Sequence, residues 1–202
     1  MKNKKVYYWS PFLSKVATVD AVINSAISLK NFNKELYDVN IINVFGEFTE
    51  YEKKLNENNV NLINFRKSRI INYFPKPGYL RSRLLSIYIF FRYFLPLKNL
   101  LRNNPPEFFI IHLITSLPLF LSLFFKTNVK IIFRISGYPQ LNFFRKFFWR
   151  IAFKNIYKVT SPTIATKKNM IKEKIIEENK IILLRDPIIS PKKINFLTKK
   201  KK

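Results

Sequence analysis

The chain of 202 residues contains no cysteine, only three glycines and a single histidine. Without cysteine the protein can form no disulfide framework, no cysteine-ligated zinc site and no thiol nucleophile. One histidine beside few carboxylates is too little for a metal site, so we expect none. P-loop, GxGxxG, nucleophile-elbow and Asp-x-Asp motifs are also absent. The lack of cysteine fits a reducing cytoplasm.

Acidic residues are scarce as well. Twelve Asp and Glu stand against 37 Lys and Arg, a net charge of +25, and Glu107 is the single acidic residue between positions 58 and 172, against twenty basic ones. Such a charge attracts polyanions: phospholipid headgroups, pyrophosphate-linked lipids or nucleic acid. The alternative is a lysine-rich composition whose charges are simply solvated.

Long uninterrupted apolar runs are missing too. Residues 108–125 approach the roughly 20 residues that a spanning helix needs, but His112, Thr115, Ser116 and Pro118 interrupt them. We therefore expect a strand, a polar turn and a helix there. Residues 84–97 are too short to span and contain Arg92. The N-terminus has a basic start but lacks a cleavage site, so we expect no signal peptide.

What is present is an alternation of apolar strands and helices. Hydrophobic residues make up 48% of the chain, enough for one folded domain. Thr18 is the expected N-cap of the first helix and Asp20 lies in its first turn. Because strands and helices alternate and the strands are continuously apolar, the pattern predicts a parallel α/β sheet. The expected strands are 5–10, 37–46, 60–65, 108–114, 129–134, 156–160 and 180–189, and the expected helices include 18–32, 48–59, 79–101 and 117–126.

Four loops follow the expected strands, at 10–15, 112–116, 134–139 and 160–163. In open α/β sheets ligands bind at the carboxyl ends of strands. Gly137 follows a buried strand, where we expect a positive φ and a close approach to a ligand. Arg134 could bind a phosphate through two N–H groups. His112 either faces a ligand or is satisfied by backbone hydrogen bonds.

The first of these loops carries Ser14 and Lys15 just before the first helix. Backbone N–H groups and the helix dipole make a helix N-terminus a site for phosphate. These two residues are therefore candidate phosphate ligands.

The run VKIIFRISGYPQ at 129–140, then IYKVTSPT and KIILLRDPII, resembles in order and spacing the N-terminal domain of a GT-B, family 4 type glycosyltransferase. The resemblance implies an α/β, Rossmann-like, three-layer domain with a mostly parallel sheet over residues 1–190, and a disordered lysine-rich tail over 191–202. It implies that His112, Ser136 and Gly137 lie near the acceptor. Ser136 stands where the family usually has His, and the glycine pair usual before the first helix is missing near Ser14 and Lys15.

The family's catalytic residues lie in a second domain, which binds the nucleotide-sugar, and no position here matches them. The resemblance therefore implies the acceptor-binding half of an enzyme that is truncated or split and inactive alone, with no cofactor beyond the nucleotide-sugar donor. It further implies a lipid-linked saccharide acceptor in cell-surface polysaccharide assembly. The expected location is cytoplasmic, peripheral on the inner face of the cytoplasmic membrane.

The basic aromatic segment 79–101 contains Arg81, Arg83, Arg92 and Lys98 among apolar residues. This composition suits an interfacial helix on an anionic membrane surface, or a helix packed on the sheet with its arginine heads in water. Two other functions remain open: a membrane-associated scaffold without catalysis, and a basic nucleic-acid-binding protein. Against the last, the aromatic residues lie in apolar runs rather than in an exposed stacking pattern, so no nucleic-acid partner is expected.

Overall fold

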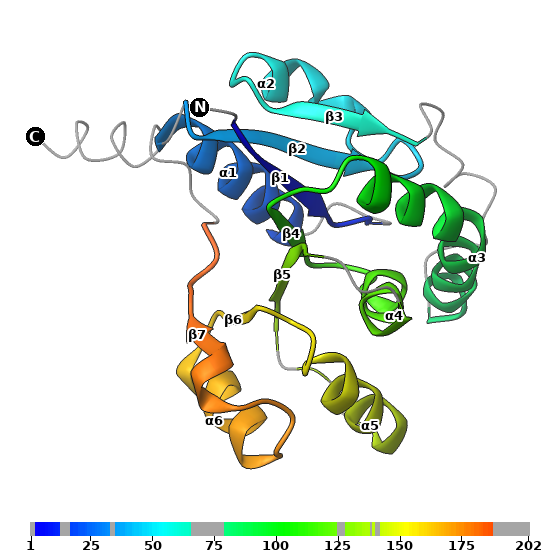
Figure 1. The fold of residues 1–202 in the computed structure, drawn as a ribbon, viewed down its shortest axis with the longest axis vertical. Coiled ribbons are helices and arrows are strands. Elements are labelled where there is room, and N and C mark those ends of the chain that lie inside the picture. The colour runs from blue at the N-terminus through cyan, green and yellow to red at the C-terminus, as the bar shows by residue number, and fades with distance from the viewer. Residues whose placement is uncertain are drawn as a thin grey trace, which may run out of the picture.

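The computed structural model describes residues 3–12, 17–32, 35–65, 79–124, 128–137, 139 and 142–187 (Figure 1). The described part contains a seven-stranded sheet with the order β3-β2-β1-β4-β5-β6-β7, in which every neighbouring pair is parallel. The strands are β1 (Lys4–Trp9), β2 (Tyr37–Asn43), β3 (Asn61–Asn64), β4 (Phe108–Ile111), β5 (Lys130–Arg134), β6 (Lys158–Ser161) and β7 (Ile181–Leu183). The predicted α/β, Rossmann-like fold is confirmed.

The helices connect successive strands. They are α1 (Ala17–Phe32), α2 (Glu52–Asn56), α3 (Tyr79–Asn103), α4 (Ser116–Phe124), α5 (Phe143–Ala152) and α6 (Ile164–Lys172), with short 3-10 turns at Thr49–Tyr51 and Glu178–Lys180. Residues 108–124 form a strand and a separate helix, as the polar interruptions predict. Thr18 lies inside α1 rather than capping it, so that prediction was wrong. Asn142 and Thr163 cap α5 and α6 through their side chains.

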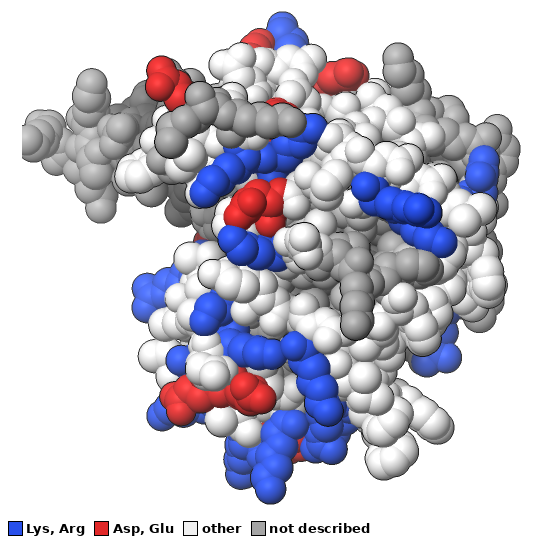
Figure 2. All heavy atoms as spheres, viewed as in Figure 1, with Lys and Arg blue, Asp and Glu red and all other residues white. Residues whose placement is uncertain are grey.

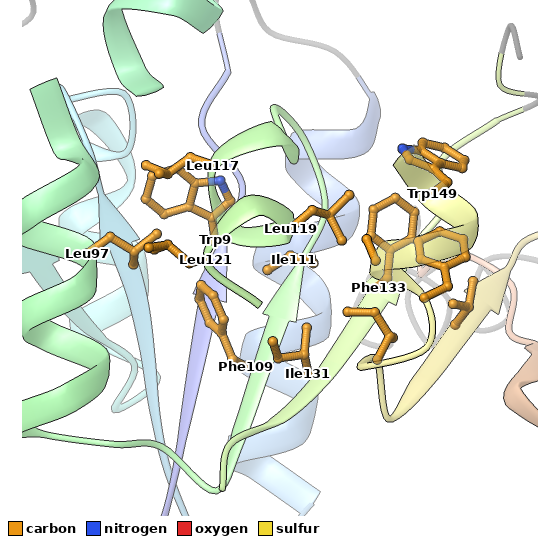
Figure 3. Packing of buried hydrophobic residues seen from close by; sticks show 14 of the residues in the cluster. Trp9, Leu97, Phe109, Ile111, Leu117, Leu119, Leu121, Ile131, Phe133 and Trp149 are labelled. Atoms are coloured by element: carbon orange, nitrogen blue, oxygen red, sulfur yellow. The ribbon is translucent and has the colours of Figure 1, made fainter. Parts of the chain in front are cut away.

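Two apolar cores hold the layers together, because alternate residues of each strand point to opposite faces. On one face Val6 and Tyr8 of β1 pack with Val22 and Ile23 of α1. On the other face Trp9 belongs to a larger core that α3, α4 and α5 cover (Figure 3). That core includes Leu97, Leu117, Phe133 and Trp149, with the rings of Phe133 and Trp149 edge to face at 5.3 Å.

Helix α3 is apolar on two opposite sides. Every fourth residue from Leu85 to Leu101 is buried in the core, whereas Ile87, Phe91 and Leu95 on the outer side are 55%, 75% and 60% exposed. The stretch Arg83–Asn103 is long and apolar enough to cross a membrane by length and composition, with a mean hydropathy of 1.3 in its best window, of which 28% is buried. The buried stripe packs the helix on the sheet, and the outer stripe leaves a second apolar surface.

Candidate functional site

A row of polar side chains crosses the sheet where the strands end. The register aligns Trp9 with Ile42 and Ile111 on its two sides, and Ile111 with Phe133. The residue that follows each of these four, one position further along its strand, is polar. The register continues from β5 into β6, which adds a fifth polar residue. The row is Asn43, Ser10, His112, Arg134 and Thr160, all buried.

This row lies at the point where the strand order reverses. Strand β1 pairs with β2 on one side and β4 on the other, and the helices that follow β1 and β4 pack into opposite cores. Ser10 follows β1 and His112 follows β4, and the backbone N–H of His112 donates to the carbonyl of Trp9 at 2.9 Å. Open α/β sheets bind ligands at such a reversal.

Asn43 and Arg134, on the two sides of Ser10 and His112, have partners within the protein. Asn43 donates from Nδ2 to Oδ1 of Asn64 at 2.7 Å and accepts from the backbone N–H of Phe48 at 2.9 Å. Arg134 donates to Oδ1 of Asp186 at 2.6 Å, with side chains only 4% and 15% exposed. Because these two side chains already have partners within the protein, they shape the site.

The middle members differ. Among the described residues, Ser10 Oγ and both ring nitrogens of His112 are buried without a hydrogen-bond partner. Leaving such groups unpaired costs on the order of 1–3 kcal/mol each. The expectation that backbone hydrogen bonds satisfy the His112 ring is therefore wrong, and the alternative, a ring that meets a ligand, gains support.

Burial keeps the His112 ring neutral. Desolvation, and secondarily the nearby Arg134 cation, lower the pKa of His112 from 6.5 to about 3. A neutral imidazole presents one N–H donor and one acceptor. Either nitrogen can pair with a hydroxyl group, which donates one hydrogen bond and accepts others.

The chain after β7 crosses to the α1 side of this row. Asp186 pairs with Arg134, the backbone N–H of Leu184 donates to the carbonyl of Ser161 at 2.9 Å, and Asn24 of α1 donates to the carbonyl of Pro187 at 2.9 Å. These three contacts hold residues 184–187 in place. Arg134 is therefore already paired with a carboxylate, and any phosphate would have to share its guanidinium.

A cleft of about 870 Å³ opens beside the row, between α3, the loops after β4 and β5, and α5. His112 and Arg134 line it together with Ser136 and Gly137, both of which are exposed. The structure thus brings together four of the predicted site residues. Ser14 and Lys15 lie outside the described residues.

Gly137 differs from the prediction. Of the described glycines only Gly46 has a positive φ, 86°, so Gly137 is not needed for a left-handed turn. A Cβ built at Gly137 would meet nothing within 4 Å. The position faces the open space of the cleft, where the lack of a side chain leaves room for a ligand.

The loop after β4 holds an unusual backbone conformation. Ile114, which lines the cleft, has φ 47°, a region that β-branched residues rarely occupy. The indole N–H of Trp9 donates to the carbonyl of Ile114 at 3.0 Å. This hydrogen bond helps to hold the strained loop, and strain of this kind concentrates at functional sites.

The rim of the cleft is cationic and aromatic. Arg83 of α3 and Arg145 of α5 line it, as do Ile87 and Phe144, which are 55% and 80% exposed. Elsewhere basic side chains lie at many places on the visible face, and acidic ones at fewer (Figure 2). Within the described ranges no group of three His, Asp or Glu residues could hold a metal ion.

Comparison with solved structures shows the same fold in enzymes of sugar nucleotides. A glycosyltransferase from Rickettsia africae superposes with a TM-score of 0.56 at 16% identity, over 99% of this chain and 49% of that one. A putative UDP-N-acetylglucosamine 2-epimerase from Listeria monocytogenes gives 0.59 at 11% identity, over 89% and 44%. UGT89C1 of Arabidopsis thaliana, solved with UDP-L-rhamnose, gives 0.53 at 13% identity, over 98% and 56%.

The chain therefore spans about half the length of these proteins, and at such identities the likeness concerns the fold. It is the GT-B-like, Rossmann-type α/β fold that the sequence predicts. By sequence, no protein-family model and no curated protein matches the chain.

Proposed function

We propose that this chain is the acceptor-binding half of a glycosyltransferase that moves a sugar from a nucleotide-sugar to a lipid-linked saccharide. The observation that carries the proposal is the buried ring of His112, which lines a cleft at the reversal of strand order and has no hydrogen-bond partner; Ser10, next to it in the row, has none either. A saccharide hydroxyl supplies the donor and acceptor that these groups lack. The GT-B-like fold supports the nucleotide-sugar as the donor.

Each part of the site has a role in this proposal. His112 and Ser10 bind an acceptor hydroxyl. The ion pair of Arg134 with Asp186 fixes the surroundings of the His112 ring. Ser136 and Gly137 leave the cleft open for the sugar. Arg83 and Arg145 on the rim attract the pyrophosphate of the carrier lipid, while Ser14 and Lys15 are proposed phosphate ligands before α1.

The proposal assigns donor binding and the catalytic residues to a second domain, so this chain alone turns over no nucleotide-sugar. The length shared with the similar structures, about half of each, supports this division. We further propose a family 4 type enzyme of cell-surface polysaccharide assembly. It would act at the inner face of the cytoplasmic membrane, because the acidic lipids of that face attract the excess of basic residues in the chain.

A binding experiment tests the role of the site. A short prenyl pyrophosphate that carries one hexose, and the same pyrophosphate without the sugar, are titrated into the purified chain and into the His112→Gln variant by calorimetry. We expect His112→Gln to weaken binding of the sugar-bearing ligand about 10-fold, or about 1.4 kcal/mol. Binding of the sugar-free ligand should stay unchanged.

The matched control is Lys168→Gln, an exposed position on α6, which should alter neither affinity. Equal losses for both ligands, or no binding of either, would contradict a saccharide site at His112. Binding of duplex DNA with a steep salt dependence, without binding of either pyrophosphate, would favour the nucleic-acid alternative. Sugar transfer by the chain alone would contradict the proposed division between two domains.

A further inference from the structure

A second groove lies at the opposite edge of the sheet from the cleft. It has a volume of about 470 Å³ and lies between the end of α3 and α4, beside Pro105 and Asn128, which precede β4 and β5. Its volume falls within the roughly 300–1,000 Å³ of small-molecule sites. The cleft and this groove touch α3 at Ile87 and Leu101, about 21 Å apart along the helix.

The floor of the groove is apolar. Leu101, Leu121 and Ile131 line it and are 8%, 3% and 6% exposed, so little of each side chain reaches water. Phe124, at the end of α4, is 63% exposed at the groove. Its ring packs on Phe120 with centroids 4.4 Å apart. A hydrocarbon chain is the ligand that such a floor favours, because the chain's own apolar surface and that of the Phe124 ring leave water when it binds.

The rim of the groove is cationic. Lys98 and Arg102 line it, one helical turn apart on α3. Helices α3, α4 and α5 contain no acidic residue in their sequences. The rim therefore favours an anionic headgroup.

The outer stripe of α3 connects the groove to a surface suited to lipid. Leu84, Ile87, Phe91 and Leu95 are exposed along it, and the same side of the helix continues to Lys98 and Arg102 at spacings of three and four residues. A helix with such a stripe lies flat in the headgroup region of a bilayer. In that orientation the groove opens toward the lipid from which a chain can enter.

We infer that this groove between α3 and α4 binds one anionic phospholipid, with an acyl chain on Leu101, Leu121 and Ile131 and the headgroup phosphate at Lys98 and Arg102. The inference rests on the proposed membrane location, but it does not depend on sugar transfer. It assigns the protein a lipid site separate from the cleft.

The test uses the full chain and a short-chain lipid kept below its micelle concentration. Dioctanoylphosphatidylglycerol is titrated by calorimetry, with dioctanoylphosphatidylcholine, octanoate and glycerol 3-phosphate as comparison ligands. We expect one site for the phosphatidylglycerol and weaker binding of the other three. Arg102→Gln should weaken phosphatidylglycerol about fivefold, whereas Lys168→Gln on α6, which removes the same charge, should not.

A second variant obstructs the groove itself. Ser122 lines it, and its hydroxyl donates to the carbonyl of Leu119 within α4 at 2.6 Å. Ser122→Phe should abolish lipid binding while the melting temperature shows that the chain still folds; if it does not fold, Ser122→Leu takes its place. The inference is overturned if phosphatidylcholine, glycerol 3-phosphate or octanoate binds as tightly as phosphatidylglycerol. It is also overturned if the Ser122 variant binds phosphatidylglycerol as the wild type does.

Neither Arg102→Gln nor the Ser122 variant should change binding of the prenyl pyrophosphate saccharide in the cleft. If the wild-type chain binds phosphatidylglycerol but not the prenyl pyrophosphate saccharide, the proposed function is overturned and the lipid site stands. The reverse result would overturn the lipid site alone.

Discussion

The two ends of the sheet use polar residues in opposite ways. At the amino ends of the strands Glu107 and Lys130 form an exposed ion pair at 2.6 Å. At the carboxyl ends Arg134 and Asp186 form a buried one at the same distance, beside two buried groups that lack partners. The polar groups at the amino ends are open to water. At the carboxyl ends the polar groups are buried, and some of them have no hydrogen-bond partner in the protein.

Backbone strain follows the same division. Asn59 and Lys174, with φ 55° and 52°, each follow a helix and precede a strand. In both cases the next N–H bonds back to the carbonyl five residues earlier, Val60 to Leu55 and Ile175 to Met170, as in a Schellman helix ending. Ile114, with φ 47°, ends no helix and lies in the cleft. Positive φ therefore completes helices at one end and shapes the site at the other.

The largest expected effect on stability is at the buried ion pair. Asp186→Ala leaves the Arg134 cation buried and unpaired, so we expect the free energy of unfolding to fall by about 3–5 kcal/mol. Glu107→Ala at the exposed pair should leave the urea midpoint at pH 7 almost unchanged. Equal shifts of the two midpoints would remove the distinction between the ends.

The His112 ring predicts a pH dependence. Its native pKa of about 3 lies below the unfolded 6.5, so the unfolded chain binds a proton first as the pH falls. The stability contribution is fully present above pH 6.5 and is lost toward pH 3. At pH 4.5 the loss is about 3 kcal/mol.

The His112→Gln variant should lack this component. Because His112 is the sole histidine, subtracting the stability profile of the variant from that of the wild type between pH 7 and pH 4.5 isolates its titration. Parallel profiles would mean that the pKa of His112 is the same in the native and the unfolded protein.

The strain at Ile114 can be measured with a pair of variants. Ala is normally better than Gly by about 0.5–1 kcal/mol, but at φ 47° the order should reverse. We expect Ile114→Gly to be more stable than Ile114→Ala by about 1 kcal/mol in urea unfolding. The usual order at this position would mean that the loop is not strained.

The smallest effect is expected at the amino end. Lys174→Gly removes the strain of a helix ending without touching the cleft, and should raise the free energy of unfolding by about 0.5–1 kcal/mol. It should leave binding of the prenyl pyrophosphate saccharide unchanged, because Lys174 does not line the cleft. A loss of saccharide binding in Lys174→Gly would show that strain at the two ends is not separate.

The alternation of strands and helices could be predicted because it is a local pattern. The interruptions at His112 and Pro118 correctly separated β4 from α4. The N-cap at Thr18 could not be placed, since α1 begins at Ala17 and helix ends depend on contacts beyond the local pattern. His112, Arg134, Ser136 and Gly137 were brought to one cleft because parallel strands end at the same edge.

The polar row was predicted only in part, because its alignment depends on register. The four predicted ligand loops begin at Ser10, His112, Arg134 and Thr160, whereas Asn43 lies inside an expected strand and was missed. Only the pairing of five strands brings all five into one row. Asp186 is 52 residues from Arg134, and their pairing depends on the path of the chain after β7. The signal that found four members of the row is the polar residue that directly follows an apolar run.

The strand order also has a consequence for biosynthesis. Val6 of β1 pairs with Phe108 of β4, 102 residues further along. A ribosome that adds about 5–20 residues per second completes β4 some 5–20 s after β1. During that interval Tyr7 and Trp9, which end fully covered by α3 and α4, have no β4 to pack beside. Strand β1, an inner strand of the finished sheet, thus waits without one of its two neighbours, and a chaperone that covers its open edge would act in that interval.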